Sequence, residues 1–101
     1  MAGRFSGKTI VVTGSGKQKG LGQAILQRFA DEGANCVVSD VVIDSEAESV
    51  AEELRSRGAQ VATIACDVSQ ADKCQGLIDQ AVAHFGSVDI HVNNAGIGFM
   101  M

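Results

Sequence analysis

The 101-residue chain contains no proline, no low-complexity stretch and no apolar run longer than a β-strand. These absences leave no visible linker or domain boundary, no membrane-spanning segment and no secretion signal within residues 1–8. The chain also has little net charge, since eight basic and twelve acidic side chains give a formal charge of −4. This balance favours neither nucleic acid nor a membrane surface as a partner. We therefore expect a cytoplasmic protein.

Potential metal ligands are few. Cys36, Cys66 and Cys74 form an odd set without C-x-x-C spacing, and each lies among apolar neighbours. This setting is typical of reduced thiols buried in a cytosolic protein. His84 and His91 have no acidic or cysteine partner at ligand spacing. We therefore predict no metal site.

Apolar residues nevertheless make up 46% of the chain, enough for one core. Short runs rich in β-branched residues predict strands at residues 8–13, 36–39, 60–65 and 88–92. Between them, apolar residues at helical spacing predict helices over residues 20–33, 45–58 and 69–86, each ending at a glycine. An alternating order of this kind, with short connections, predicts an α/β fold with a parallel sheet and helices on both faces.

The sequence also predicts how the helices begin and which side each one buries. Ser45 and Glu48 have the spacing of a capping box, and Ser69 is the expected N-cap of the third helix. The predicted buried faces are Leu21, Ala24, Ile25 and Phe29 in the first helix, Ala47, Val50, Ala51 and Leu54 in the second, and Cys74, Leu77, Ile78, Ala81, Val82 and Phe85 in the third.

A glycine-rich turn, residues 13–22, lies between the first predicted strand and the first helix. Gly14, Gly20 and Gly22 would let a pyrophosphate approach the main-chain amides at a helix N-terminus. A tight turn without a ligand is the alternative. Lys17 is followed by Gln18, where a nucleotide-binding P-loop needs a hydroxyl residue, so that motif is excluded.

Asp40 stands at the end of the second predicted strand, eighteen residues after Gly22. A carboxylate there can accept hydrogen bonds from both hydroxyls of an adenosine ribose and would repel a 2′-phosphate, which favours NAD over NADP. Lys17 and Lys19 leave NADP as the alternative cofactor, because a lysine in the turn can pair with a 2′-phosphate. A solvated loop acid or a helix cap is the alternative role of Asp40.

Together these features resemble the short-chain dehydrogenase/reductase family. The glycine-rich turn and Asp40 are followed by Asp67-Val68 after the third strand and by residues 93–96, Asn-Asn-Ala-Gly, after the fourth. The resemblance spans essentially the whole chain. It implies a Rossmann-like, doubly wound parallel sheet, of which residues 1–101 would be the first half, the N-terminal part of a single NAD(P)-binding domain.

The resemblance implies a role for each landmark. Amides of the turn, the Leu21 N–H among them, would bind the pyrophosphate. Asp67 would hydrogen-bond the adenine amino group, the Val68 backbone would contact the ring, and residues 94–96 would pack beneath the ribose on the nicotinamide side. The predicted cofactor-binding residues are Gly14, Ser15, Lys19, Gly20, Leu21, Gly22, Asp40, Asp67, Val68, Asn94, Ala95 and Gly96.

Some assignments stay open at this point. Five residues separate Gly14 from Gly20, where the commonest family pattern has three, so the contacts of residues 15–17 are undecided and the turn should bulge outward. An alternative for Asp67 is to cap the third helix. The alternative for Asn93-Asn94 is a structural turn that ties neighbouring strands together.

The resemblance also implies a reaction, hydride transfer between nicotinamide and a ketone or secondary alcohol, with tyrosine, lysine and serine as the catalytic groups. The chain contains no tyrosine, so we assign it no catalytic residue and expect an inactive fragment of a longer, homo-oligomeric enzyme for a small carbonyl or alcohol substrate. A non-catalytic nucleotide-binding module is one alternative. An S-adenosylmethionine methyltransferase is another, although it would give residues 93–96 no role.

Overall fold

The computed structural model describes residues 3–94 of the chain. Strands and helices alternate in the predicted order, with boundaries that differ from the sequence prediction by one or two residues at most ends. The elements are β1 (Thr9–Val12), α1 (Leu21–Asp31), β2 (Asn35–Asp40), α2 (Ser45–Ser56), β3 (Val61–Ala65), α3 (Ala71–Phe85) and β4 (Ile90–Val92). None of these helices is both long and apolar enough to cross a lipid bilayer.

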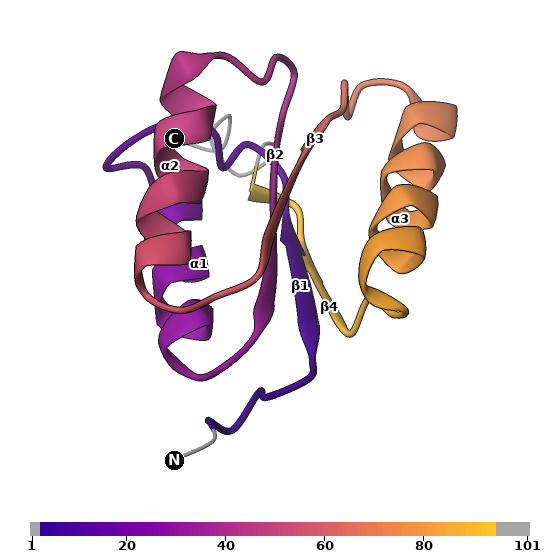
Figure 1. The fold of residues 1–101 in the computed structure, drawn as a ribbon. Coiled ribbons are helices and arrows are strands. Elements are labelled where there is room, and N and C mark those ends of the chain that lie inside the picture. The colour runs from indigo at the N-terminus through magenta and orange to yellow at the C-terminus, as the bar shows by residue number, and fades with distance from the viewer. Residues whose placement is uncertain (1–2, 95–101) are drawn as a thin grey trace.

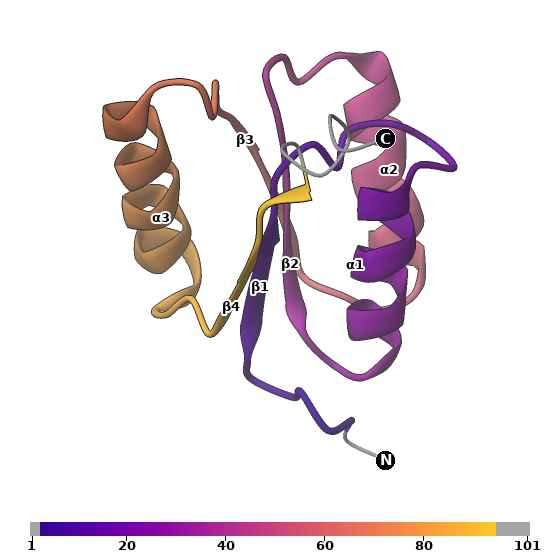
Figure 2. The same cartoon turned by 180° about the vertical axis from the view of Figure 1, so that it is seen from behind.

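The four strands form one parallel sheet in the order β3-β2-β1-β4. Helices α1 and α2 cover one face and α3 covers the other (Figures 1 and 2). The predicted doubly wound α/β architecture is thus confirmed. Because the strands are parallel, the three connections that lead from a strand into a helix lie at the same end of the sheet, at the top of Figure 1.

The two central strands, β1 and β2, carry apolar runs that are buried because both faces of the sheet are covered there. On β1, Ile10 and Val12 point into the cluster that α1 and α2 share, whereas Val11 lies in the cluster beneath α3. Val37 on β2 joins Val11 on the α3 side. All four side chains have 0% exposure.

The predicted buried face of α2 is confirmed, since all four of its residues have 0% exposure. The predicted face of α1 was partly wrong. Leu21 is 57% exposed and Ala24 is also exposed, and the helix instead packs through Gly22, Leu26 and Ala30. These three residues form a ridge at four-residue spacing along the sheet. Leu21 is the first residue of the helix and is left in solvent.

The predicted N-caps were wrong for both α2 and α3. Helix α2 is capped one residue earlier than Ser45, by Asp44, whose side chain accepts a hydrogen bond from the Ala47 amide at 3.0 Å. Asp44 has the extended backbone conformation of an N-cap, whereas Ser45 is already the first residue of the helix. Helix α3 follows Gln70, which makes no side-chain cap, and Ser69 belongs to the preceding loop.

The predicted helix ends at glycines are confirmed. Gly33, Gly58 and Gly86 have φ of +93°, +93° and +91°, a left-handed conformation that reverses the chain after α1, α2 and α3. Side chains with a Cβ are strained in this region, so the glycines stop the helices where the sequence indicates.

Candidate functional site

Hydrogen bonds hold the glycine-rich turn to two strands, β4 and β2. After β1 the Thr13 amide donates to the Val92 carbonyl at 3.0 Å, and the Ser15 amide donates to the Ser39 carbonyl at 2.8 Å. The Ser15 hydroxyl donates to the Val12 carbonyl at 2.6 Å and accepts from the Ser39 amide at 3.0 Å. Ser15 is fully buried, so its side chain holds the turn against β2.

Gly22 lies where the turn, α1 and the residues after β4 converge. A Cβ at this position would lie 2.8 Å from Ser15 Cα, a distance that real Cβ atoms essentially never show, and 3.0 Å from Asn94 Nδ2. The Asn94 amide nitrogen donates to the Gly14 carbonyl at 3.1 Å. The structure therefore brings together four of the predicted cofactor-binding residues, Gly14, Ser15, Gly22 and Asn94, while Ala95 and Gly96 lie outside the described residues.

Among the described residues, no side chain caps the first main-chain amides of α1. Gly20 is the N-cap, there is no side-chain cap hydrogen bond, and the first turn contains no acidic residue. Just before it, Lys19 has φ of +63°, and its amide donates to Gln23 Oε1 at 2.6 Å. Sequence reasoning missed Gln23, although a glutamine three residues after an N-cap is a known signal for a side chain that reaches back.

The Asp40 carboxylate faces the turn. Its Oδ2 accepts from the Gly16 amide at 3.1 Å and its Oδ1 accepts from the Val41 amide at 2.8 Å. A Cβ on Gly16 would lie 3.0 Å from the Asp40 Cβ, so glycine permits this close approach. A carboxylate has about four lone-pair sites, and two protein donors leave acceptor capacity for further hydroxyl groups.

The residues that lengthen the turn relative to the commonest family pattern contact the start of α2. Lys17 Nζ lies 3.9 Å from Asp44 Oδ2 and 3.7 Å from Glu46 Oε1. The Gln18 amide donates to Glu46 Oε2 at 2.9 Å. The hydrogen bond from Ala47, followed by the Lys17 charge, holds the pKa of the Asp44 carboxyl below its ordinary value. The charge of Lys17 is therefore balanced by two carboxylates.

The loop after β3 lies next to Asp40, because the Cys66 amide donates to the Asp40 carbonyl at 2.8 Å. Asp67 Oδ1 accepts from the Ser69 hydroxyl at 2.7 Å and the Ser69 amide at 3.0 Å, and these bonds lower the pKa of the Asp67 carboxyl. Asp67 thus shapes the loop before α3 but does not cap the helix, whose N-cap is Gln70. Val68 packs at the edge of the cluster beneath α3.

Two exposed valines were missed by sequence reasoning. Val41 and Val42 follow Asp40 directly and are 60% and 63% exposed. The sequence offered a signal for them, because both are apolar residues that lie outside any predicted helical or strand pattern. Such residues beside the end of a strand are left in solvent. They add an apolar surface beside the carboxylate.

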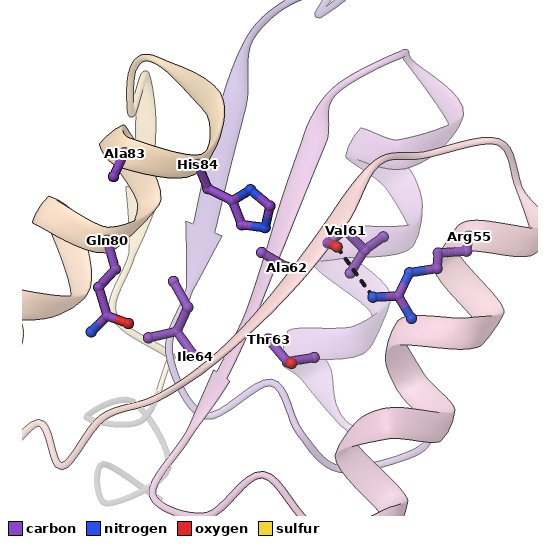
Figure 3. Close-up of a pocket in the computed structure, with 8 residues that line it drawn as sticks. All are labelled: Arg55, Val61, Ala62, Thr63, Ile64, Gln80, Ala83 and His84. Carbon is purple, nitrogen blue, oxygen red and sulfur yellow. Dashed lines mark hydrogen bonds between the residues drawn. The ribbon is translucent and has the colours of Figure 1, made fainter.

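A hollow of about 550 Å³ opens at the outer edge of β3, between α2 and α3 (Figure 3). Arg55 flanks it from α2, and Gln80 and His84 flank it from α3. The Arg55 guanidinium is already paired with Glu52 at 2.6 Å and donates to the Val61 carbonyl at 3.2 Å. None of the predicted cofactor residues lines this hollow, so it is separate from the glycine-rich turn.

The parallel sheet, the glycine-rich strand-to-helix turn and the acid at the end of β2 define the class of dinucleotide-binding α/β folds. A family model described as short chain dehydrogenase matches residues 8–101. The chain therefore belongs to the short-chain dehydrogenase family. This membership favours the dehydrogenase interpretation over the methyltransferase alternative.

Individual relatives agree with the family match. The chain is 41% identical over 92 residues to glucose 1-dehydrogenase 2 of Bacillus subtilis, covering 91% of this chain and 35% of that protein. It is 40% identical over 93 residues to 3beta-hydroxysteroid dehydrogenase 2 of Eggerthella lenta, covering 92% of this chain and 35% of that protein. The chain thus spans about a third of the length of these relatives.

Solved structures match equally well. The crystal structure of a short-chain dehydrogenase/reductase from Burkholderia xenovorans superposes with a TM-score of 0.83 at 38% identity, covering 92% of this chain and 36% of that chain. That of a hydroxysteroid dehydrogenase from Escherichia coli gives a TM-score of 0.80 at 37% identity, covering 89% of this chain and 37% of that chain. The Rossmann-like fold predicted from the sequence is therefore confirmed.

Proposed function

We propose that residues 14–22 and Asp40 bind NAD, as the nucleotide-binding part of an oxidoreductase. The single observation that supports this most directly is the Asp40 carboxylate, which lies 3.1 Å from the Gly16 amide and so faces the same turn as the uncapped N-terminus of α1. The pyrophosphate would accept hydrogen bonds from the amides of Leu21 and Gly22. The ribose hydroxyls would donate to Asp40.

The other predicted residues extend the same site. The adenine ring would pack against exposed Val41 and against Val68, with Asp67 near its amino group. Asn94 is already bonded to the Gly14 carbonyl, and it would continue with Ala95 and Gly96 beneath the ribose on the nicotinamide side. Ser15 and Lys19 would shape the turn through their buried hydroxyl and backbone bonds.

The charges around the turn support NAD over NADP. A 2′-phosphate would be placed against the Asp40 carboxylate, which costs electrostatic free energy. Lys17 is the lysine of the turn that reaches the start of α2, and its ammonium is already paired with Asp44 and Glu46. A 2′-phosphate would therefore lie against the Asp40 carboxylate, beside a lysine that already faces two other carboxylates.

The reaction proposed for the longer enzyme is hydride transfer between nicotinamide and a ketone or secondary alcohol. The two curated relatives are named for glucose and for a 3beta-hydroxysteroid, at 41% and 40% identity, so similarity over this part of the chain does not select a substrate. The 101 residues contain no tyrosine to act as the acid/base, and we expect no turnover by them alone. We also expect the longer enzyme to be a homo-oligomer.

Binding can be measured through the fluorescence of the reduced cofactor, because the chain has neither tryptophan nor tyrosine to interfere. NADH should bind more tightly than NADPH, and S-adenosylmethionine should not compete. Asp40→Asn should weaken NADH binding by about tenfold, or about 1.4 kcal/mol, through the loss of charged acceptors for the ribose. Asp72→Asn, a substitution at an exposed residue of α3, is the matched control and should bind NADH normally. Equal affinities of the two variants would disprove the role of Asp40.

A further inference from the structure

Two of the three thiols meet at one loop. Cys66 directly follows β3 and Cys74 lies in the first turn of α3, on either side of the β3–α3 connection at the top of Figure 1. Both side chains belong to the apolar cluster on the α3 side of the sheet. Cys36 lies in the other cluster, beneath α1 and α2, and is separated from them by the sheet.

Each of the two thiols donates a hydrogen bond to a carbonyl near the other thiol. Cys66 Sγ donates to the carbonyl of Lys73, the residue before Cys74, at 3.5 Å. Cys74 Sγ donates to the carbonyl of Val68, two residues after Cys66, at 3.7 Å. Each sulfur thus reaches over to the part of the loop that carries the other.

From this arrangement we propose that Cys66 and Cys74 form a reversible disulfide, an oxidation site at the edge of the candidate nucleotide site. Hydrogen peroxide is the oxidant. The Cys74 thiolate attacks one peroxide oxygen, giving a sulfenic acid and releasing one water after protonation. The deprotonated Cys66 sulfur then attacks Cys74 Sγ, the S–S bond forms and a second water leaves. Two thiols lose two electrons and two protons in total, and the peroxide is reduced to two waters.

Exposure sets the order of the two steps. Cys74 is partly exposed, whereas Cys66 is 5% exposed. Burial, with a further contribution from the Cys74 thiol, raises the pKa of the Cys66 thiol and disfavours its direct reaction with peroxide. Cys36 has no exposed surface, and burial raises the pKa of its thiol to about 12, so it stays reduced.

A disulfide would act on the loop that holds Asp67 and Val68, a consequence that depends on the NAD site proposed above. The two sulfurs must approach to about 2.0 Å, which draws the start of α3 toward the end of β3. The Val68 and Lys73 carbonyls lose their S–H donors at the same time. The adenine side of the site should then bind NAD severalfold more weakly.

The disulfide can be detected without any cofactor. Trypsin cleaves after Arg28, Arg55, Arg57 and Lys73, so each cysteine falls on a different peptide. After peroxide treatment, alkylation and digestion without reductant, peptide 58–73 should be linked to the peptide that begins at Cys74, with Cys36 alkylated. A link that involves Cys36, or an overoxidised Cys74 beside an alkylated Cys66, would overturn the proposal.

Variants separate the disulfide from its effect on binding. Cys74→Ser should leave Cys66 unlinked, while Cys36→Ala, the matched control, should keep the link. Oxidised protein should bind NADH severalfold more weakly, dithiothreitol should restore the affinity, and peroxide should leave the affinity of Cys74→Ser unchanged. An unchanged affinity in linked protein would overturn the coupling. Absence of NADH binding in both redox states would refute the proposed function and the coupling, and the peptide map alone would then decide on the disulfide.

Discussion

The N-termini of α1 and α2 both lie at the carboxyl end of the sheet, but their amides are satisfied in different ways. Helix α2 is capped by its own Asp44 and has Glu46 and Glu48 in its first turn. Helix α1 opens at Gly20 with no side-chain cap and no acid in its first turn. Acids of the chain itself balance the positive end of the α2 dipole, whereas the positive end of the α1 dipole is open to an external anion.

The difference also explains how one anion site is selected. The acids of α2 repel a phosphate from the neighbouring helix and at the same time hold Lys17, at 3.7 Å from Glu46. The Lys17 side chain thus extends toward α2. The proposed site predicts that a negatively charged ligand at this end of the sheet is directed to α1, and the following variants test that contrast.

The largest effect is expected from Gly22→Ala. The new Cβ would lie 2.8 Å from Ser15 Cα, so the turn must move off α1, which should abolish detectable NADH binding and lower the free energy of unfolding by about 1–3 kcal/mol. Gly76→Ala is the control. Its Cβ on α3 meets nothing within 4 Å, and it should bind NADH normally while gaining about 0.5–1 kcal/mol. Thermal melts and titration of both variants check the prediction.

A second substitution makes α1 resemble α2. Gly20→Asp places a carboxylate on the open amides, and NADH affinity should fall by about tenfold because this charge competes with the pyrophosphate. Gly20→Asn adds a side chain of the same shape without the charge. Its Cβ meets the same Lys17 carbonyl at 3.2 Å, so the comparison isolates the electrostatic part. Similar affinities for the two variants would contradict an anion site at α1.

A smaller effect is expected at α2. Glu46→Gln frees Lys17 from one of its two carboxylates, and the ratio of NADPH to NADH affinity should rise by about twofold to fivefold, since exposed ion pairs are worth about 0–1 kcal/mol. Glu48→Gln removes the other first-turn acid, which is not paired with Lys17. Parallel titrations with both cofactors measure the two ratios. A larger rise for Glu48→Gln would mean that Lys17 is not the group involved.

The order of elements could be predicted because its signals are local: β-branched runs, helical spacing and glycines at helix ends. The errors arose at the starts of helices, and the contacts that were missed join distant segments. Leu21 continues an apolar pattern, but it is the first residue of α1 and remains 57% exposed. The contacts of Lys17 with α2 and of Gly16 with Asp40 join residues more than twenty positions apart, and no sequence spacing encodes them. The residue types of the site were therefore predictable, and their mutual contacts were not.

The smallest predicted effect concerns acid. The pKa of Asp44 lies below its ordinary value of 3.8, first because the Ala47 amide donates to it and then because Lys17 is near. A lowered folded pKa means that the carboxylate stabilises the fold above pH 3.8, and that this contribution is lost as the pH falls through the folded value. Asp44→Asn keeps a capping acceptor without a titrating charge. Its melting temperature should lie slightly below that of the parent protein at neutral pH, and the gap should close as the pH falls below 3.8, whereas a gap that widens in acid would reverse the sign of the argument.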